Sequence, residues 1–445
     1  MDNKWRKLEL GWNKLLLLLV LVFILLSGCA SHNENITRQE SSPPGVTDRI
    51  TIRIAQSLPN DVRTKSLKAL IQAFERLHPN IKVELVSTDY ATADETIMKL
   101  LGEEQGIDIV EVRTGNMQSF ISEGLIENLQ PYVAQWDKYS MLSENARTAA
   151  TNLDGTPYYI PSGLYQSQLY YRKDLFEAKA LQVPETWEQL YYVGKQLTSA
   201  PRNQFGYAFR GGTGATRMLN QIIQAYNSDD VNLGEPMYRH DGRSIFAYDG
   251  ALQAIELYRN IYADTSPPES INWGFNEQVE AFANGMTAML IQDSDAIALI
   301  EEKLAYGIWA TAPLPAGPGG VSYYSVGGAG WGISSKSGHK NEAWELITFL
   351  SSTDNHMKFA KDTGVIPIYN NVDDSEFFKT GAFAPYILMN NNPVRYAGTR
   401  TLGGFAQNGD YTQNGPDMLR KYLRGDWTGE HLLEQLDEMW KRSPE

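Results

Sequence analysis

Short apolar runs alternate with longer amphipathic runs through the first third of the chain, and this alternation constrains the fold most. Residues 49–58, 81–88 and 107–112 have the pattern of strands, with apolar side chains at short intervals. Residues 61–80, 93–104 and 116–129 have the spacing of helices. Strands that alternate with helices predict an α/β fold whose strands are parallel.

Polar residues follow each of these predicted strands. Because ligands of parallel sheets bind beyond the carboxyl ends of the strands, these residues are candidates for a binding site. The positions concerned are Gln56 and Ser57, Thr88 and Asp89, and the segment 111–116, which includes Glu111, Arg113 and Asn116.

The rest of the chain has further amphipathic segments, and the whole chain is too long for one hydrophobic core. A chain of 445 residues predicts two lobes. Further helical patterns lie at 185–198, 214–227, 249–262, 275–285 and 340–352. The Gly- and Pro-rich segment 312–335 predicts either a strand pair with tight turns or a crossing between lobes.

The amino-terminal residues have the features of an export signal. Lys4, Arg6 and Lys7 precede an unbroken apolar run from Leu15 to Leu26. That run is shorter than the roughly 20 apolar residues of a spanning helix. We therefore expect residues 1–28 to be a signal peptide, although an uncleaved membrane anchor with an incidental cysteine is the alternative.

The residues Leu-Ser-Gly-Cys that end this segment resemble a bacterial lipobox. Cleavage before Cys29 would leave the only cysteine of the chain as the first residue, where it would carry lipid such as palmitate. Acyl chains on Cys29 would hold the protein at a membrane. The polar segment 29–48 predicts a flexible, lipidated tether, and the folded body would act on the outer face of the cytoplasmic membrane.

Charge and motifs exclude several functions. The net charge of −14 argues against a nucleic-acid partner. The sequence lacks the serine-hydrolase, zinc-protease, Walker A and dinucleotide motifs, and its six histidines show no zinc-ligand spacing. We therefore expect no enzyme activity, no metal and no cofactor.

Six segments, in order, resemble the family of extracellular solute-binding proteins of ABC importers that includes maltose- and oligosaccharide-binding proteins. They include "AFERLHPNIKVELV", "IDIVEVRTGNMQSFISEGLIENLQPYV", "VEAFANGMTAMLI" and "TGVIPIY". The resemblance implies a two-lobe periplasmic-binding-protein-like fold, with a hinge of several crossings and a ligand cleft between the lobes. It implies lobe 1 at 48–160 plus 326–355, and lobe 2 at 161–325 plus 356–445.

The same resemblance implies a monomer that passes a carbohydrate ligand to the transmembrane subunits of an ABC permease. Family members often place a tryptophan after the segment that reads "GMTAMLI" here. This chain has Asp293 and Asp295 at about those places. An aromatic platform must therefore come from elsewhere, or the ligand is held more by hydrogen bonds.

A sugar site needs aromatic rings for stacking, and carboxylates, amides or arginines for hydroxyl groups. Each candidate also has a purely structural interpretation, such as a core ring, a helix cap, a hydrophobic staple or a solvated surface charge. Glu111 and Arg113 could also pair with each other. Besides the strand-end residues, the candidates are Tyr165, Arg210, Trp273, Asp293, Asp295, Trp331 and Arg395. The glycines that flank Trp331 in "GGAGWG" are expected to let the backbone approach a ligand and to leave the ring exposed.

Three functions remained open on the sequence alone. The first is a binding protein for an oligosaccharide, or for a polyamine, a phosphorylated polyol or an acidic uronide. The second is an anchored glycosidase or lyase, for which Asp293 and Asp295 would be the carboxyl pair. The third is a sensor lipoprotein.

Overall fold

The computed structural model describes residues 49–442, except 89–91, 105, 306 and 371–375. The predicted signal peptide, Cys29, the tether and Asp89 lie outside the described residues. Within the described ranges, no helix is both long enough and apolar enough to cross a membrane.

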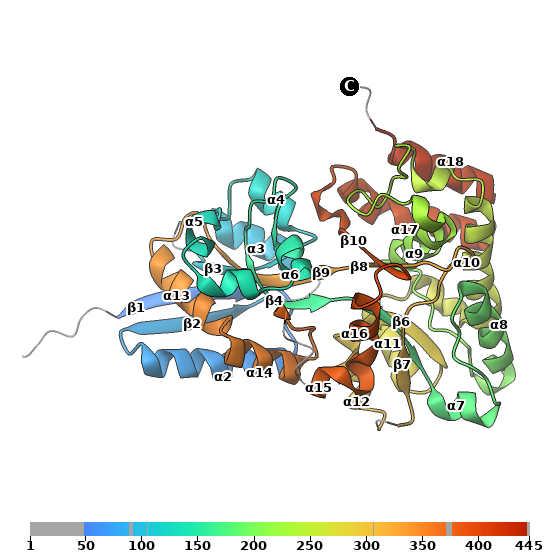
Figure 1. Cartoon of the computed structure of the whole chain (residues 1–445), viewed down its shortest axis with the longest axis horizontal. Coiled ribbons are helices and arrows are strands. Elements are labelled where there is room, and N and C mark those ends of the chain that lie inside the picture. Colours follow the sequence, from blue (N-terminus) through green and yellow to red (C-terminus); the bar gives the residue numbers. More distant parts are fainter. Residues whose placement is uncertain (1–48, 89–91, 105, 306, 371–375, 443–445) are drawn as a thin grey trace, which may run out of the picture. The chain divides into compact units, whose positions relative to one another are not determined.

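The amino-terminal strands β1 to β4 and the later strand β9 form one five-stranded sheet, the first sheet, in the order β2-β1-β3-β9-β4 (Figure 1). β1 is parallel to β2 and β3, as the alternating pattern predicts. β9 runs antiparallel between β3 and β4. The bounds are β1 Ile50–Gln56, β2 Ile81–Ser87, β3 Ile109–Arg113, β4 Ile160–Tyr165 and β9 Gly327–Ile333.

Helices accompany this sheet where the apolar spacing predicts them. Asn60 caps α2 by accepting a hydrogen bond from the Arg63 backbone N–H, and α2 buries Leu67 and Phe74. The bounds are α2 Asp61–Leu77, α3 Ala93–Gly102, α4 Met117–Ser122, α5 Gln130–Val133, α6 Glu144–Ala150, α13 Lys340–Leu350 and α14 Thr353–Thr363. The expected helix 116–129 is wrong in length, because α4 ends before Gly124, which adopts a left-handed φ of 64°.

Two smaller groups of strands follow. β5 (Ser167–Tyr171) lies between β6 (Met289–Asp293) and β7 (Ala310–Ala312) in an antiparallel second sheet. β8 (Ser322–Ser325) pairs in parallel with β10 (Tyr396–Thr399). The surrounding helices are α7 Lys173–Ala178, α8 Trp187–Leu197, α9 Thr216–Tyr226, α10 Ala251–Thr265, α11 Phe275–Ala283, α12 Ala296–Glu301, α15 Glu376–Lys379, α16 Ala384–Asn390, α17 Asn408–Arg424 and α18 Gly429–Met439.

Short 3₁₀ turns join several of these elements. They are η2 Asp137–Met141, η3 Ala200–Arg202, η4 Ser228–Asp230, η5 Ile245–Ala247, η6 Pro268–Asn272, η8 Gly381–Phe383 and η9 Leu402–Gly404. The helical patterns expected at 185–198, 214–227, 249–262, 275–285 and 340–352 are confirmed by α8, α9, α10, α11 and α13.

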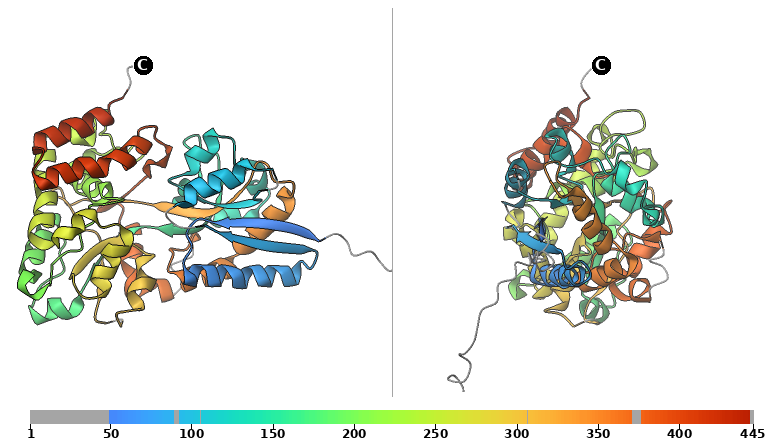
Figure 2. Two further views of the ribbon diagram at one scale, coloured as in Figure 1. Left: turned by 180° about the vertical axis from the view of Figure 1, so that it is seen from behind. Right: turned by 90° about the vertical axis from the view of Figure 1, so that its left-hand side faces the viewer.

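At two of the places where the chain passes from one sheet to another, a single residue separates the two strands. Gln166 separates β4 of the first sheet from β5 of the second, and Val326 separates β8 from β9. Both passages can be followed from behind in Figure 2. Within the segment 312–335, β8 and β9 do not pair with each other but belong to different sheets, so the strand-pair alternative is wrong. That this passage is a crossing between lobes stays a prediction. The lobe boundaries remain a prediction, and the first change of sheet lies at Gln166, after the expected boundary at 160.

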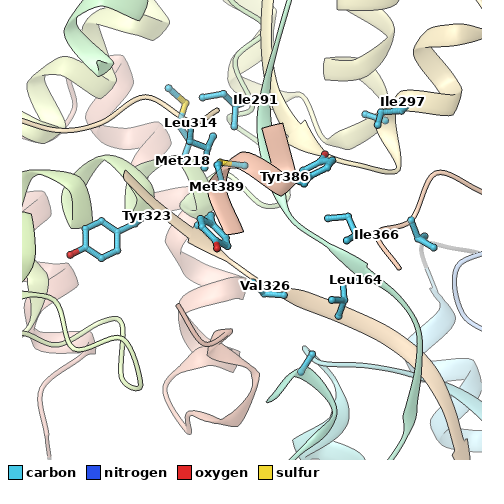
Figure 3. Packing of buried hydrophobic residues seen from close by; sticks show 14 of the residues in the cluster. Leu164, Met218, Ile291, Ile297, Leu314, Tyr323, Val326, Ile366, Tyr386 and Met389 are labelled. Carbon is cyan, nitrogen blue, oxygen red and sulfur yellow. The ribbon is translucent and has the colours of Figure 1, made fainter. Parts of the chain in front are cut away.

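Apolar side chains pack where these passages meet. Leu164 forms a bridge with Ile366, which follows α14, and Figure 3 shows both residues near Val326. Leu164, Val326 and Ile366 are all buried. The passages thus share one packed region, which fixes the side chains at the strand ends relative to one another.

Candidate ligand-binding site

A cavity of about 380 Å³ opens at the ends of β3, β4 and β6. Its wall is completed by the start of β9, by one side of α9 and by residues that follow β10. The residues with charged or amide side chains in this wall are Arg113, Arg217, Asn220, Gln221, Gln224, Asp293, Asp295, Arg400 and Asn408. The site is therefore polar and lies at strand ends, as the sheet topology leads one to expect.

A buried ion pair supports one side of the cavity. The Arg63 side chain, at the first turn of α2, is only 3% exposed and pairs with fully buried Glu111 of β3. The other Glu111 carboxylate oxygen accepts hydrogen bonds from the backbone N–H groups of Ser57, at 2.8 Å, and Leu58, at 3.0 Å. Burial lowers the pKa of Arg63, but Glu111, Tyr165 and Asp295 together outweigh this effect and the pKa is raised overall.

This ion pair also orients a residue of the cavity wall. The Arg63 Nη1 group donates a hydrogen bond to the Tyr165 hydroxyl oxygen, at 3.2 Å. Tyr165 and Leu58 both line the cavity. Because a buried charge pair is costly to break, Arg63 and Glu111 hold these two residues in fixed positions before any ligand binds.

A second charged group lies at the end of β6. Asp293 pairs with Arg217 of α9 and accepts a hydrogen bond from the Ser167 hydroxyl, at 2.8 Å. Burial and the nearby Asp293 carboxylate raise the pKa of Asp295 to about 7, although Arg217, Arg210 and Arg63 act in the opposite direction. Asp295 is thus a carboxyl group that can be protonated near neutral pH.

Two polar side chains of the wall have atoms without a partner. Both the Oε1 and the Nε2 atoms of Gln221 are buried, and no donor or acceptor of the described residues reaches either atom. The same holds for Oδ1 of Asp295. The two amide side chains near Gln221 on α9 do have hydrogen-bond partners. Asn220 accepts from the Tyr411 hydroxyl, and Gln224 donates to the Pro236 carbonyl. Buried polar atoms usually have partners, so Gln221 and Asp295 are the groups best placed to receive a ligand.

Four of the sequence-predicted residues meet in this wall, namely Arg113, Tyr165, Asp293 and Asp295. Arg210 lies near Asp295 and donates to the Thr213 carbonyl at 2.6 Å, but it does not line the cavity.

Three of the strand-end candidates, Gln56, Glu111 and Asn116, do not line the cavity but contact other residues near it. Glu111 binds Arg63, and Arg113 binds Asp94, so the alternative that Glu111 and Arg113 pair with each other is wrong. The buried Asn116 side chain accepts from the Arg113 backbone N–H at 2.9 Å. Gln56 is buried and donates to the Leu58 carbonyl at 3.2 Å.

The remaining candidates do not reach the cavity. Trp331 is only 2% exposed, because β9 lies inside the first sheet. The Trp331 ring borders a void of about 10 Å³ that residues of α2 and α14 also line. The expectation that glycines around Trp331 leave its ring exposed is therefore corrected. Trp273 is partly buried beside α11, and Arg395 pairs with Glu185 at 3.1 Å.

Sequence reasoning missed the contribution of α9 and of the segment after β10. The pattern of α9 indicated a helix, but three buried amides in the run "NQIIQ" are unusual on a core-facing helix and were the available signal. Arg400 and Leu402 follow a short strand that no local pattern indicated.

A five-stranded and a three-stranded sheet joined by a strand passage, with a polar cavity at the strand ends, fit the class of two-lobed solute-binding proteins, whose solved structures match this fold. The sequence model of the bacterial extracellular solute-binding protein family matches residues 60–357. The chain belongs to this family, which confirms the resemblance seen in the sequence segments.

Known relatives agree with this assignment. The chain is 25% identical over 352 residues to a Brucella abortus protein named only as a binding protein, with 77% of this chain and 82% of the relative covered. It is 24% identical to the multiple sugar-binding protein of Streptococcus mutans, covering 78% and 79%. The maltose-bound MalE3 of T. maritima matches the fold with a TM-score of 0.75 at 20% identity, covering 88% of this chain and 99% of that one.

Proposed function

We propose that the protein captures a sugar or oligosaccharide and delivers it to the transmembrane subunits of an ABC importer. The observation that carries this proposal is the Gln221 side chain, whose buried oxygen and nitrogen both lack a partner in the cavity wall. A carboxamide offers one acceptor beside two N–H donors, and neighbouring hydroxyl groups of a sugar can satisfy both kinds of group.

The rest of the wall fits the same kind of ligand. Asp295 adds an unpartnered oxygen, and Tyr165 offers a ring that is held in place by Arg63. Polar groups that are fixed before binding lose little entropy when a ligand arrives, so the site is suited to select one pattern of hydroxyl groups. The names of the relatives, which mention maltose and multiple sugars, support this ligand class.

The proposal includes the place where the protein works. The charged start, the apolar run and the Leu-Ser-Gly-Cys sequence support cleavage before Cys29 and lipid attachment to it. The folded body would then work as a monomer on the outer face of the cytoplasmic membrane.

Binding without turnover is the proposal, and a glycosidase is the alternative. A glycosidase needs two carboxyl groups free to act on one bond. Both carboxylate oxygens of Asp293 are occupied, one by Ser167 and the other by Arg217. This arrangement favours a positioning role for Asp293 over a nucleophilic one.

A thermal-shift panel of neutral and acidic mono- and oligosaccharides tests the proposal, because a ligand that binds only the folded state raises the midpoint. We expect at least one saccharide to raise it in the wild type. Gln221→Leu should reduce that ligand's affinity at least tenfold while the ligand-free midpoint stays equal or rises, because two unsatisfied polar atoms are removed. Unchanged affinity in Gln221→Leu, or release of cleavage products by the wild type, would contradict the proposal.

A further inference from the structure

Among the residues that line the cavity, positive side chains outnumber negative ones, whereas the whole chain is negatively charged. Three arginines line the cavity, Arg113, Arg217 and Arg400, against two carboxyl groups, Asp293 and Asp295. The whole chain has a net charge of −14. Arginines gathered in one wall of an acidic protein attract anions locally, although the rest of the surface repels them.

Two of these arginines lie apart from the carboxyl groups of the wall. Arg217 pairs with Asp293, whereas Arg113 pairs with Asp94, a 52% exposed residue outside the cavity wall. Arg400 donates to the Asn152 backbone carbonyl at 3.4 Å. In the part of the chain that the structure describes, no ion pair joins Arg113 or Arg400 to Asp293 or Asp295.

Arg113 and Arg400 belong to segments that touch one another. Gly403 of η9 lies so close to Thr114 that a Cβ atom on Gly403 would come 2.2 Å from the Thr114 carbonyl oxygen. Thr114 directly follows Arg113, and Gly403 follows Arg400 by three residues. The two guanidinium groups therefore come from adjoining parts of one wall.

We infer that the ligand is a saccharide with an anionic group, which is bound by Arg113 and Arg400 while its hydroxyl groups meet Gln221 and Asp295. This inference rests on the proposed function and specifies its ligand class. Guanidinium groups form strong, directed hydrogen bonds to carboxylate and phosphate alike. A uronic acid and a sugar phosphate share this chemistry.

The small number of aromatic rings among the described residues of the wall points the same way. Tyr165 is the one aromatic residue among the described residues of the cavity wall. Neutral sugars rely on aromatic faces for much of their affinity. In this wall, charge-assisted hydrogen bonds would supply what stacking does not, and a polyamine would meet repulsion from the arginines.

Calorimetric titration of the full chain in mild detergent tests the inference. The probes are glucose, galactose, mannose and maltose, the corresponding uronates with digalacturonate, and the hexose 6-phosphates. We expect an anionic probe to bind at least tenfold more tightly than its neutral counterpart, and the uronate and phosphate arms identify the anion. A neutral sugar that binds equally well or better overturns the inference but leaves the proposed function standing. Failure of every probe contradicts both.

Matched arginine variants locate the anion. Arg400→Gln and Arg113→Gln should each weaken the anionic probe at least tenfold and leave a neutral counterpart's affinity within about twofold. Arg395→Gln, which alters an arginine outside the cavity wall, should leave the anionic probe's affinity unchanged. Equal losses for the anionic and the neutral probe, or no loss in Arg400→Gln and Arg113→Gln, would contradict the assignment.

Discussion

Single residues decide how rigid the site is before a ligand arrives. Arg63 and Glu111 are both buried, and the Glu111 carboxylate also binds the backbone of Ser57 and Leu58. The pair connects the start of α2, the end of β1 and the end of β3 at the cavity. We interpret it as a positioning device, because it reaches the cavity through Leu58 and Tyr165.

Glu111→Gln should lower the free energy of unfolding by about 3 kcal/mol, because it leaves the Arg63 charge buried without its carboxylate. Urea unfolding followed by circular dichroism measures the change. Glu84→Gln is the matched control, since Glu84 forms an exposed pair with Lys82 and should cost less than about 1 kcal/mol. Equal effects of the two substitutions would show that burial of the Arg63 pair is unimportant.

Asp295 should make stability depend on pH in a defined direction. Its pKa is about 7 in the folded protein, above the ordinary value, so the folded state holds the proton more tightly than the unfolded state does. This stabilisation is fully present below about pH 4 and is lost as the pH rises through 7. The groups that act on the carboxyl group are Asp293, Arg217, Arg210 and Arg63.

Asp295→Asn should remove this dependence. Between pH 5 and pH 8 the wild type should lose about 1 to 2 kcal/mol relative to Asp295→Asn, because one pKa unit corresponds to about 1.4 kcal/mol and cavity water screens part of it. Denaturant unfolding at four pH values measures the difference, and His356, buried neutral with a pKa lowered to about 3, is common to both proteins. A constant difference across this range would contradict the raised pKa.

At the scale of elements, the segment from Arg400 to Gly404 forms a wall that joins β10 to the cavity and lies against Thr114. Gly403→Ala should lower the free energy of unfolding by about 1 to 3 kcal/mol, because the added methyl group meets a backbone carbonyl. Gly409→Ala is the control: it has open space and lies in α17, so stability should stay equal or rise by up to about 1 kcal/mol. Thermal unfolding distinguishes the two variants. If Gly403→Ala were as stable as the wild type, η9 would not be in tight contact with Thr114.

The elements also show how far sequence patterns reach. Local apolar spacing was enough to predict β1, α2, β2, α3 and β3 and their parallel order, since each element carries its own period. It could not predict that β9, more than 200 residues later, enters between β3 and β4. That insertion buries Trp331, whose glycine-rich surroundings had indicated an exposed ring.

The candidate site was predictable only in part, for the same reason. Asp293 and Asp295 follow a strand and could be placed at its end, and Arg113 likewise. Gln221 lies inside a helix, and its place in the cavity depends on how α9 packs against elements distant in sequence. The part of the wall that α9 supplies therefore depends on packing between residues distant in sequence, which local patterns cannot indicate.

At the scale of the whole molecule, Cys29 should decide where the protein is found if it carries lipid, as proposed. Cys29→Ala should abolish incorporation of labelled palmitate and move the protein from the membrane fraction to the soluble fraction if the leader is still cleaved, because the acyl chains supply the membrane affinity. Immunoblots of fractionated cells and metabolic labelling measure both effects. Labelling that persists in Cys29→Ala would contradict the lipid-anchor proposal.

Also at the scale of the whole molecule, we propose that the cavity at the strand ends holds a ligand without altering it. Gln221 and Asp295 offer polar atoms without a partner among the described residues, and a ligand that contacts both would stabilise the conformation in which it reaches both. This is the central claim of the account.

Equilibrium binding followed by recovery of the ligand tests that claim most directly. The saccharide that raises the unfolding midpoint is titrated calorimetrically into the full chain, and the bound fraction is then released and analysed by mass spectrometry. The account predicts saturable binding of one saccharide per chain and recovery of that saccharide unchanged. Absence of saturable binding, or recovery of a cleaved or modified saccharide, would contradict it.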